Sequence, residues 1–229
     1  MNRKVFFFII LTLCFIQVKA QRKINLPLRH QLDSLYALDQ HYRAMMSEKF
    51  TNKQIDSIKK ALNLKDGDFF SQINKISDNT DSSNTKRVQA IIAQYGYPGK
   101  SLVGEPTNEA AFFVLQHSTV IDKYLPIVEK AANEKELPFY LYAMMKDRSL
   151  MYNNKEQILG TQVKGMRLTN KQTGKLEFKM YVWPIQDAAN VNERRKAAGF
   201  PQTVEENAKR LGVSYKPYTL EQALKGDVN

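Results

Sequence analysis

Apolar residues recur every three or four positions along most of the chain, which is the spacing of an amphipathic helix. The first such pattern runs through residues 25–49 and includes Leu28, Leu32 and Leu35. Thr51 with Gln54 and Thr203 with Glu206 have the spacing of capping boxes that open helices. Further helices are predicted at residues 51–62, 81–95, 107–121 with a continuation or restart over 118–133, 138–151, 187–199, 203–212 and 219–225.

The pattern changes from helical spacing to strict alternation in the C-terminal third. Residues 166–169 and 176–183 alternate apolar and polar side chains, and the polar residues between them include Gly174. This predicts a β-hairpin at about residues 163–183. The polar stretch 77–84 is interpreted as a loop. The predicted fold class is therefore mainly α, a single-domain helical bundle with one small β-hairpin.

Residues 1–20 have the pattern of a secretory signal peptide. A basic head precedes the apolar run Val5–Ile16, and Val18-Lys19-Ala20 provides a small-residue cleavage site. The run is shorter than the roughly 20 apolar residues of a membrane-spanning helix. We therefore expect an exported protein, periplasmic or secreted, cleaved at about Ala20/Gln21. Its mature part, residues 21–229, is expected to form one mainly helical domain without a membrane span.

The cysteine and histidine content narrows the chemistry. The single cysteine, Cys14, lies in the predicted signal peptide, so the mature chain has no disulfide and relies on its core. A lipoprotein signal that uses Cys14 is disfavoured, because Leu13 before it is bulkier than the small residue that such signals favour. Three histidines without a mature cysteine argue against a zinc site, and we predict neither a metal nor a cofactor.

The net charge is strongly positive, which favours anionic surroundings. The whole chain carries +11, and removal of Arg3, Lys4 and Lys19 with the signal peptide leaves +8. The basic residues are dispersed, and aromatic residues do not alternate with them as in single-strand binding proteins. We therefore do not expect nucleic acid as a partner. The expected partner is an unknown small or envelope-derived ligand.

Ionisable residues interrupt the apolar faces of three predicted helices. Asp39 continues the leucine spacing of residues 28–35, and Arg43 follows it by four positions. His117 shares a face with apolar residues 110–114, and Asp147 and Arg148 follow apolar residues 140–145. An unpaired buried charge costs several kcal/mol, so these groups are expected to meet each other or a water-filled cavity. The candidate catalytic residues are His117, Asp39, Asp147 and Arg148.

Two further stretches carry side chains suited to ligand binding. Gln157 and Gln162 surround Gly160-Thr161, and their amides can bind a sugar, peptide or amide, although an ordinary strand start is the simpler interpretation. Asn192 and Arg195 share one side of a predicted helix and suit a carboxylate or phosphate, although a solvated basic face is simpler. The candidate ligand-binding residues are Arg43, Gln40, Gln116, Gln157, Gln162, Thr161, Asn192 and Arg195.

Several short polar motifs occur in a fixed order along the mature chain. They are Asp39-Gln40-x-x-Arg43, Tyr95-Gly96-Tyr97-Pro98, Gln116-His117, Asp147-Arg148, Gln157-x-x-Gly160-Thr161-Gln162 and Val191-Asn192-x-x-Arg195. The ordered set resembles a domain-of-unknown-function family of exported proteins from Bacteroidota and actinomycetes. The resemblance implies that these polar residues belong to one site, and it implies no reaction. Two positions depart from the family pattern: Tyr97 stands where the family usually has tryptophan, and Thr119 stands where it usually has an acidic residue. Without that acid, Asp39 or Asp147 would have to orient His117.

Three classes of function remain open from the sequence. In the first, the protein is an envelope enzyme such as a hydrolase, with His117 as general base and an acid to orient it. Arg148, with Arg43 or Arg195, would stabilise developing negative charge. In the second, it binds an anionic or amide-bearing ligand without turnover. In the third, it is a structural or interaction protein in which Asp39 and Arg43 form an internal brace.

Overall fold

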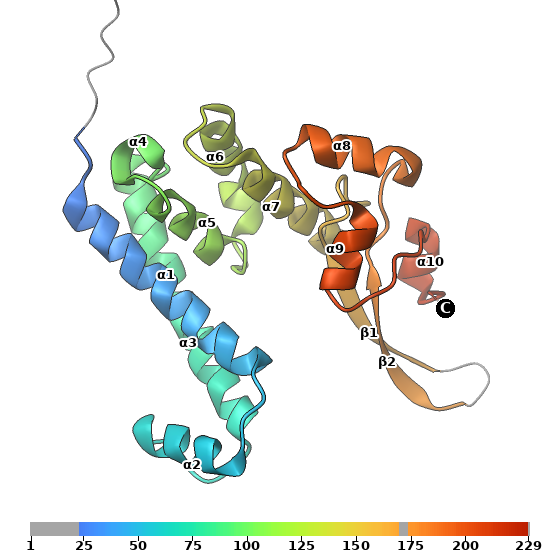
Figure 1. Cartoon of the computed structure of the whole chain (residues 1–229), viewed down its shortest axis with the longest axis horizontal. Coiled ribbons are helices and arrows are strands. Elements are labelled where there is room, and N and C mark those ends of the chain that lie inside the picture. Colours follow the sequence, from blue (N-terminus) through green and yellow to red (C-terminus); the bar gives the residue numbers. More distant parts are fainter. Residues whose placement is uncertain (1–22, 170–173, 229) are drawn as a thin grey trace, which may run out of the picture.

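The computed structural model describes residues 23–169 and 174–228 (Figure 1). The predicted signal peptide and its cleavage site at Ala20/Gln21 lie outside these residues, as does part of the predicted hairpin turn. Within the described residues, no helix combines the length and the apolar character needed to cross a membrane.

The described chain is mainly α, as predicted. Its helices are α1 (Leu26–Ser47), α2 (Asn52–Ala61), α3 (Phe69–Tyr95), α4 (Lys100–Val103), α5 (Ala110–Leu115), α6 (Ile121–Asn133), α7 (Phe139–Tyr152), α8 (Val191–Ala197), α9 (Val204–Arg210) and α10 (Leu220–Lys225), with 3-10 turns at Thr107–Glu109 and Ala188–Asn190. The strands β1 (Val163–Thr169) and β2 (Leu176–Val182) pair antiparallel and confirm the predicted hairpin.

The largest apolar core joins α1 and α3–α7. Leu32 and Leu35 of α1, Val88 of α3, Phe112 of α5 and Met145 of α7 are all fully buried in it. Helices α1 and α3 lie side by side along much of their length (Figure 1). This core therefore fixes the relative positions of α1, which carries Asp39, of α7, which carries Arg148, and of α5, whose end precedes His117.

Smaller apolar clusters hold the C-terminal part around the hairpin. Tyr181 and Trp183 pack with Ala223 of α10 on one side, and Val182 packs with Val204 of α9 on the other. The segment that joins α7 to β1 is tied to this part through a bridge between Gln157 and Ile185. The hairpin is thus anchored at its base by both neighbouring clusters.

Helix α3 is longer than predicted, and the predicted loop at residues 77–84 is wrong. Ser77 and Asn84 are buried on the inner face of α3, in phase with Val88. The Asn84 side chain donates a hydrogen bond to the Leu35 carbonyl oxygen of α1 at 3.2 Å. Ser, Asp and Asn have low intrinsic helix propensity, and these tertiary contacts override it.

The apolar run at residues 110–133 forms two helices rather than one. Helix α5 ends at Leu115 and α6 begins at Ile121. Gln116 and His117 occupy the turn between them, so His117 is positioned by a helix end instead of a helix face. This break explains why a polar pair interrupts an apolar sequence.

Candidate functional site

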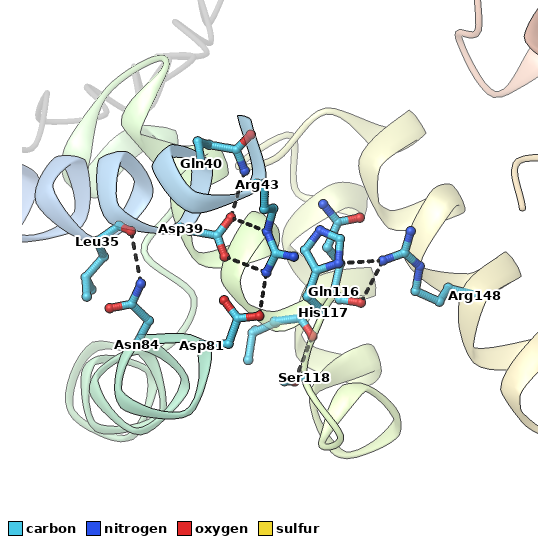
Figure 2. Close-up of polar contacts among 11 residues, drawn as sticks. Leu35, Asp39, Gln40, Arg43, Asp81, Asn84, Gln116, His117, Ser118 and Arg148 are labelled. Atoms are coloured by element: carbon cyan, nitrogen blue, oxygen red, sulfur yellow. Dashed lines mark hydrogen bonds and ion pairs between the residues drawn. The ribbon is translucent and has the colours of Figure 1, made fainter. Parts of the chain in front are cut away.

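Arg43 is held between two carboxylates, one from α1 and one from α3. Its Nε and Nη2 atoms donate to the two oxygens of Asp39 at 3.3 and 3.2 Å, and Nη2 also donates to Asp81 Oδ2 at 2.7 Å (Figure 2). Gln40 Nε2 donates to Asp39 at 2.7 Å. The predicted pairing of Asp39 with Arg43 is therefore confirmed, and Asp39 is buried as its spacing indicated.

Asp81 is a member of this cluster that the sequence analysis missed. Its Oδ1 atom is buried and accepts no hydrogen bond in the part of the chain that the structure describes. Burial raises the pKa of the Asp81 carboxyl, and the Arg43 charge opposes that shift. The spacing of Ser77, Asp81 and Val88 places them on one face of a helix, and this pattern could have revealed that Asp81 faces the interior. No group of three or more His, Cys, Asp or Glu suited to a metal ion occurs among the described residues.

Arg148 connects α7 to the turn that contains His117. Its Nη1 atom donates to the Gln116 carbonyl oxygen at 3.1 Å and lies 3.0 Å from His117 Nδ1 (Figure 2). On the other side, Nε donates to Gln162 Oε1 at 2.9 Å. All three partners are uncharged groups, so these contacts leave the positive charge of Arg148 without a counter-ion.

His117 is a neutral ring in this environment. Burial and then the charges of Arg148 and Arg43 lower its pKa from 6.5 to about 3. A guanidinium can only donate, so Nδ1 accepts from Arg148 and the ring proton resides on Nε2. The structure thus presents His117 as a donor through Nε2. We expected Asp39 or Asp147 to orient the ring, and neither does.

Asp147 is instead the anchor of the segment that follows α7. Its oxygens accept from the backbone nitrogens of Ile158, Leu159 and Thr161 at 2.7–3.1 Å and from the Thr161 hydroxyl at 3.0 Å. Its side chain is fully buried. Burial raises the pKa of the Asp147 carboxyl, and these hydrogen bonds oppose that shift. Both oxygens of Asp147 therefore bind the 158–161 segment, and Asp147 makes no contact with His117.

The two glutamines have different roles. Gln157 binds the backbone of Gln162 in both directions, at 2.8 and 3.0 Å, and donates to the Trp183 carbonyl at 2.6 Å. Gln162 binds Thr161 and Met144 through its amide nitrogen and Arg148 through its oxygen. The Gln157 side chain thus binds main-chain groups of Gln162 and Trp183, as a neighbouring strand would. Only Gln162 contributes to the Arg148 cluster.

Asn192 and Arg195 do not join the Arg148 cluster. Arg195 is buried, donates to the carbonyls of Leu159 and Gln202 at 2.7 and 2.8 Å, and lies over the Phe200 ring. Asn192 binds Glu205 and the backbone of Val204. The sequence suggested either a carboxylate or phosphate site or a solvated basic face here, and both side chains instead make contacts within the protein, with Arg195 buried. The motif residues therefore gather in three places: around Arg43, around Arg148 and around the 157–162 segment. Asn192 lies outside these groups and contacts α9.

The comparison with known proteins confirms the expected likeness to a domain of unknown function. A model described as a family of unknown function (DUF6624) matches residues 40–217, which is more than half of the chain. The match includes all the motif residues named above except Asp39. No curated protein and no solved structure matches the chain.

The Asp147 anchor leads to a prediction about stability. The Asp147→Asn variant replaces an acceptor oxygen with an NH₂ group that faces the N–H donors of residues 158–161. We expect it to lower the free energy of unfolding in urea by about 2–4 kcal/mol. The control is Asp122→Asn, at an exposed carboxylate that binds only side chains, Ser149 and Asn153, with an expected loss below about 1 kcal/mol. Equal losses in the two variants would contradict the anchor role.

The low pKa of His117 predicts a pH dependence of stability. The unfolded chain protonates this ring near pH 6.5 and the folded chain near pH 3, so the unfolded state binds more protons between these values. Stability attributable to His117 is therefore complete above pH 6.5 and is lost as the pH falls toward 3.

The measurement is urea denaturation across this pH range for the original chain and His117→Asn. The asparagine keeps an acceptor for Arg148 but does not titrate. Relative to the variant, the original chain should lose up to about 1.4 kcal/mol per pH unit. Replacing the exposed His30 by Asn should preserve the original pH dependence. Parallel curves for the original chain and His117→Asn would refute the assignment.

Proposed function

Because the chain belongs to the DUF6624 family, whose function is unknown, its role has to be inferred from the site, and we propose that it binds a small anionic ligand at Arg148 and His117. The ligand presents a carboxylate or phosphate group. Arg43 lies close enough for its charge to act on both residues, but it is itself paired with Asp39 and Asp81, so Arg148 is the cation that the ligand meets. This is the second of the three functional classes that the sequence left open.

The uncompensated charge of Arg148 carries the proposal. The side chain is largely buried and its partners are a histidine nitrogen, a carbonyl and an amide oxygen. Its Nη2 atom has no hydrogen-bond partner among the described residues. A guanidinium in such a setting interacts more strongly with an anion than it would in water, because the surroundings screen the charge less.

His117 adds a neutral donor beside that charge. In Figure 2 the His117 ring lies between the guanidinium groups of Arg43 and Arg148. Its Nε2–H is free to donate because Nδ1 is occupied by Arg148. Arg148 Nη2 and His117 Nε2 are thus two N–H donors without a protein acceptor among the described residues, and each can donate to an anion oxygen.

The same geometry favours binding over hydrolysis with His117 as the base. A general base needs a free lone pair and a pKa near the working pH. The Nδ1 lone pair is directed at Arg148, and the pKa of the ring is lowered to about 3. The contacts support a role for His117 in holding negative charge rather than in removing a proton.

Titration with inorganic phosphate and with acetate at constant ionic strength tests the proposal. Binding is followed by calorimetry and by the NMR signals of the His117 ring. Arg148→Met should weaken binding by about tenfold or more, because a charge-assisted hydrogen bond is lost. His117→Asn keeps the acceptor for Arg148 and removes the distal donor, and we expect an intermediate loss.

The control is Arg87→Met, which removes the same charge at an exposed position of α3 and should leave binding unchanged. Unchanged affinity in a folded Arg148→Met chain, or equal losses in the Arg87 and Arg148 variants, would show that the anions respond only to net charge. Absence of binding by either anion to the original chain would also reject the proposal.

We further propose that the chain is exported with removal of residues 1–20, so that the ligand is encountered outside the cytoplasm. The basic head, the apolar run and the small residue at Ala20 support this. Expression of the full chain in a bacterial host should yield protein that begins at Gln21, as measured by mass spectrometry. The Ala20→Asp variant should keep its signal sequence. Intact precursor in the cytoplasmic fraction of the original chain would contradict export.

A further inference from the structure

A hollow lies between α7, the segment after it and α8, and none of the groups proposed to hold the anion lines it. Its volume is about 360 Å³, and its lining is mostly apolar. Lys146 and Arg194 are the cationic residues of the lining. We propose that this hollow binds an amphipathic anion, a molecule with an apolar body and one carboxylate-type head group.

Small side chains create the space for the apolar body. Ala143 of α7, Leu159 and Ala198 form a buried cluster of their own, apart from the large core. Two alanines facing each other across the helices leave room that larger residues would fill. The rings of Phe139 and Tyr142, in edge contact at 5.4 Å, also line the hollow. Such a concave apolar surface with few polar groups is typical of small-molecule sites.

The charges around the hollow indicate where the head group lies. Arg194 is already satisfied, because it binds Asp187 and the carbonyls of residues 158, 186 and 187. The Lys146 ammonium makes no hydrogen bond or ion pair in the described residues. An anionic head group at Lys146 therefore meets a cation that has no carboxylate in direct contact among the described residues.

The nearby carboxylates are occupied by other donors. Lys146 acts on the pKa of Asp122, but the oxygens of Asp122 accept from Ser149 and Asn153. Asp147 lines the hollow with its oxygens bound to residues 158–161. On the side of α6, Glu129 accepts from the Tyr142 hydroxyl at 2.6 Å. Each of these acids is thus turned toward a protein donor.

The test compares decanoate with decanol, which share an apolar chain and differ in charge. Both are titrated into the full chain by calorimetry, below the concentration at which decanoate forms micelles. Decanoate should bind about tenfold more tightly than decanol. Lys146→Met should remove that preference while leaving decanol affinity unchanged. Lys60→Met, which removes the same charge from exposed α2, should keep the preference.

Filling the hollow tests its location. Ala198→Phe should weaken both ligands by about tenfold or more. Where this variant fails to fold, Ala197→Phe at an exposed lining position takes its place, with the same expectation. Equal preference for decanoate in the original chain and the Lys146 variant, or unchanged binding of both ligands after filling, overturns the proposal.

Phosphate titration distinguishes the two proposals. Lys146→Met should bind phosphate as the original chain does, and Arg148→Met should keep its preference for decanoate. Loss of phosphate binding in the Arg148 variant alone, with decanoate retained, would establish two independent sites. Loss of both ligands in both variants would contradict the separation of the hollow from the Arg148 cluster.

Discussion

The buried carboxylate of Asp147 is the constraint on which the C-terminal half of the molecule depends. A charge in this position persists only when donors surround it, and the donors are the backbone nitrogens of residues 158, 159 and 161. The chain must therefore turn back along α7 directly after the helix ends. Later elements dock on the same segment, since Arg195 binds the Leu159 carbonyl and Asn207 binds the Gly160 carbonyl.

Arg148, the next residue of α7, makes the complementary connection. It contacts the α5–α6 turn on one side and Gln162 on the other. Gln162 comes directly after the segment that Asp147 holds, so two consecutive residues of one helix join the N-terminal core to the base of the hairpin. The polar site is consequently built on rigid elements, although His117 itself lies in a turn.

The sequence predicted which positions are buried better than it predicted their partners. Helical spacing placed Asp39 and Asp147 in the interior correctly, and it paired Asp39 with Arg43 because both lie on one helix. The partners of Asp147 and Arg148 come from segments whose approach depends on tertiary packing, so spacing carried no information about them. Met46 shows the opposite case, because it continues the apolar spacing of α1 beyond the core and is 40% exposed. The break between α5 and α6 contains no Gly or Pro, so the sequence carries no helix-breaking residue that predicts it.

A comparison of three arginines explains why the ligand is assigned to Arg148. Arg43 binds two carboxylates, and the charge of Arg195 is favoured by Asp147 and Glu205. Arg148 has neutral contacts, and Arg43 adds a like charge nearby, so burial lowers its pKa without a carboxylate to restore it. A cation kept in that state costs stability, and such local inconsistency is concentrated at functional sites. An arriving anion would relieve the cost at Arg148, whereas at Arg43 it would compete with acids already in place.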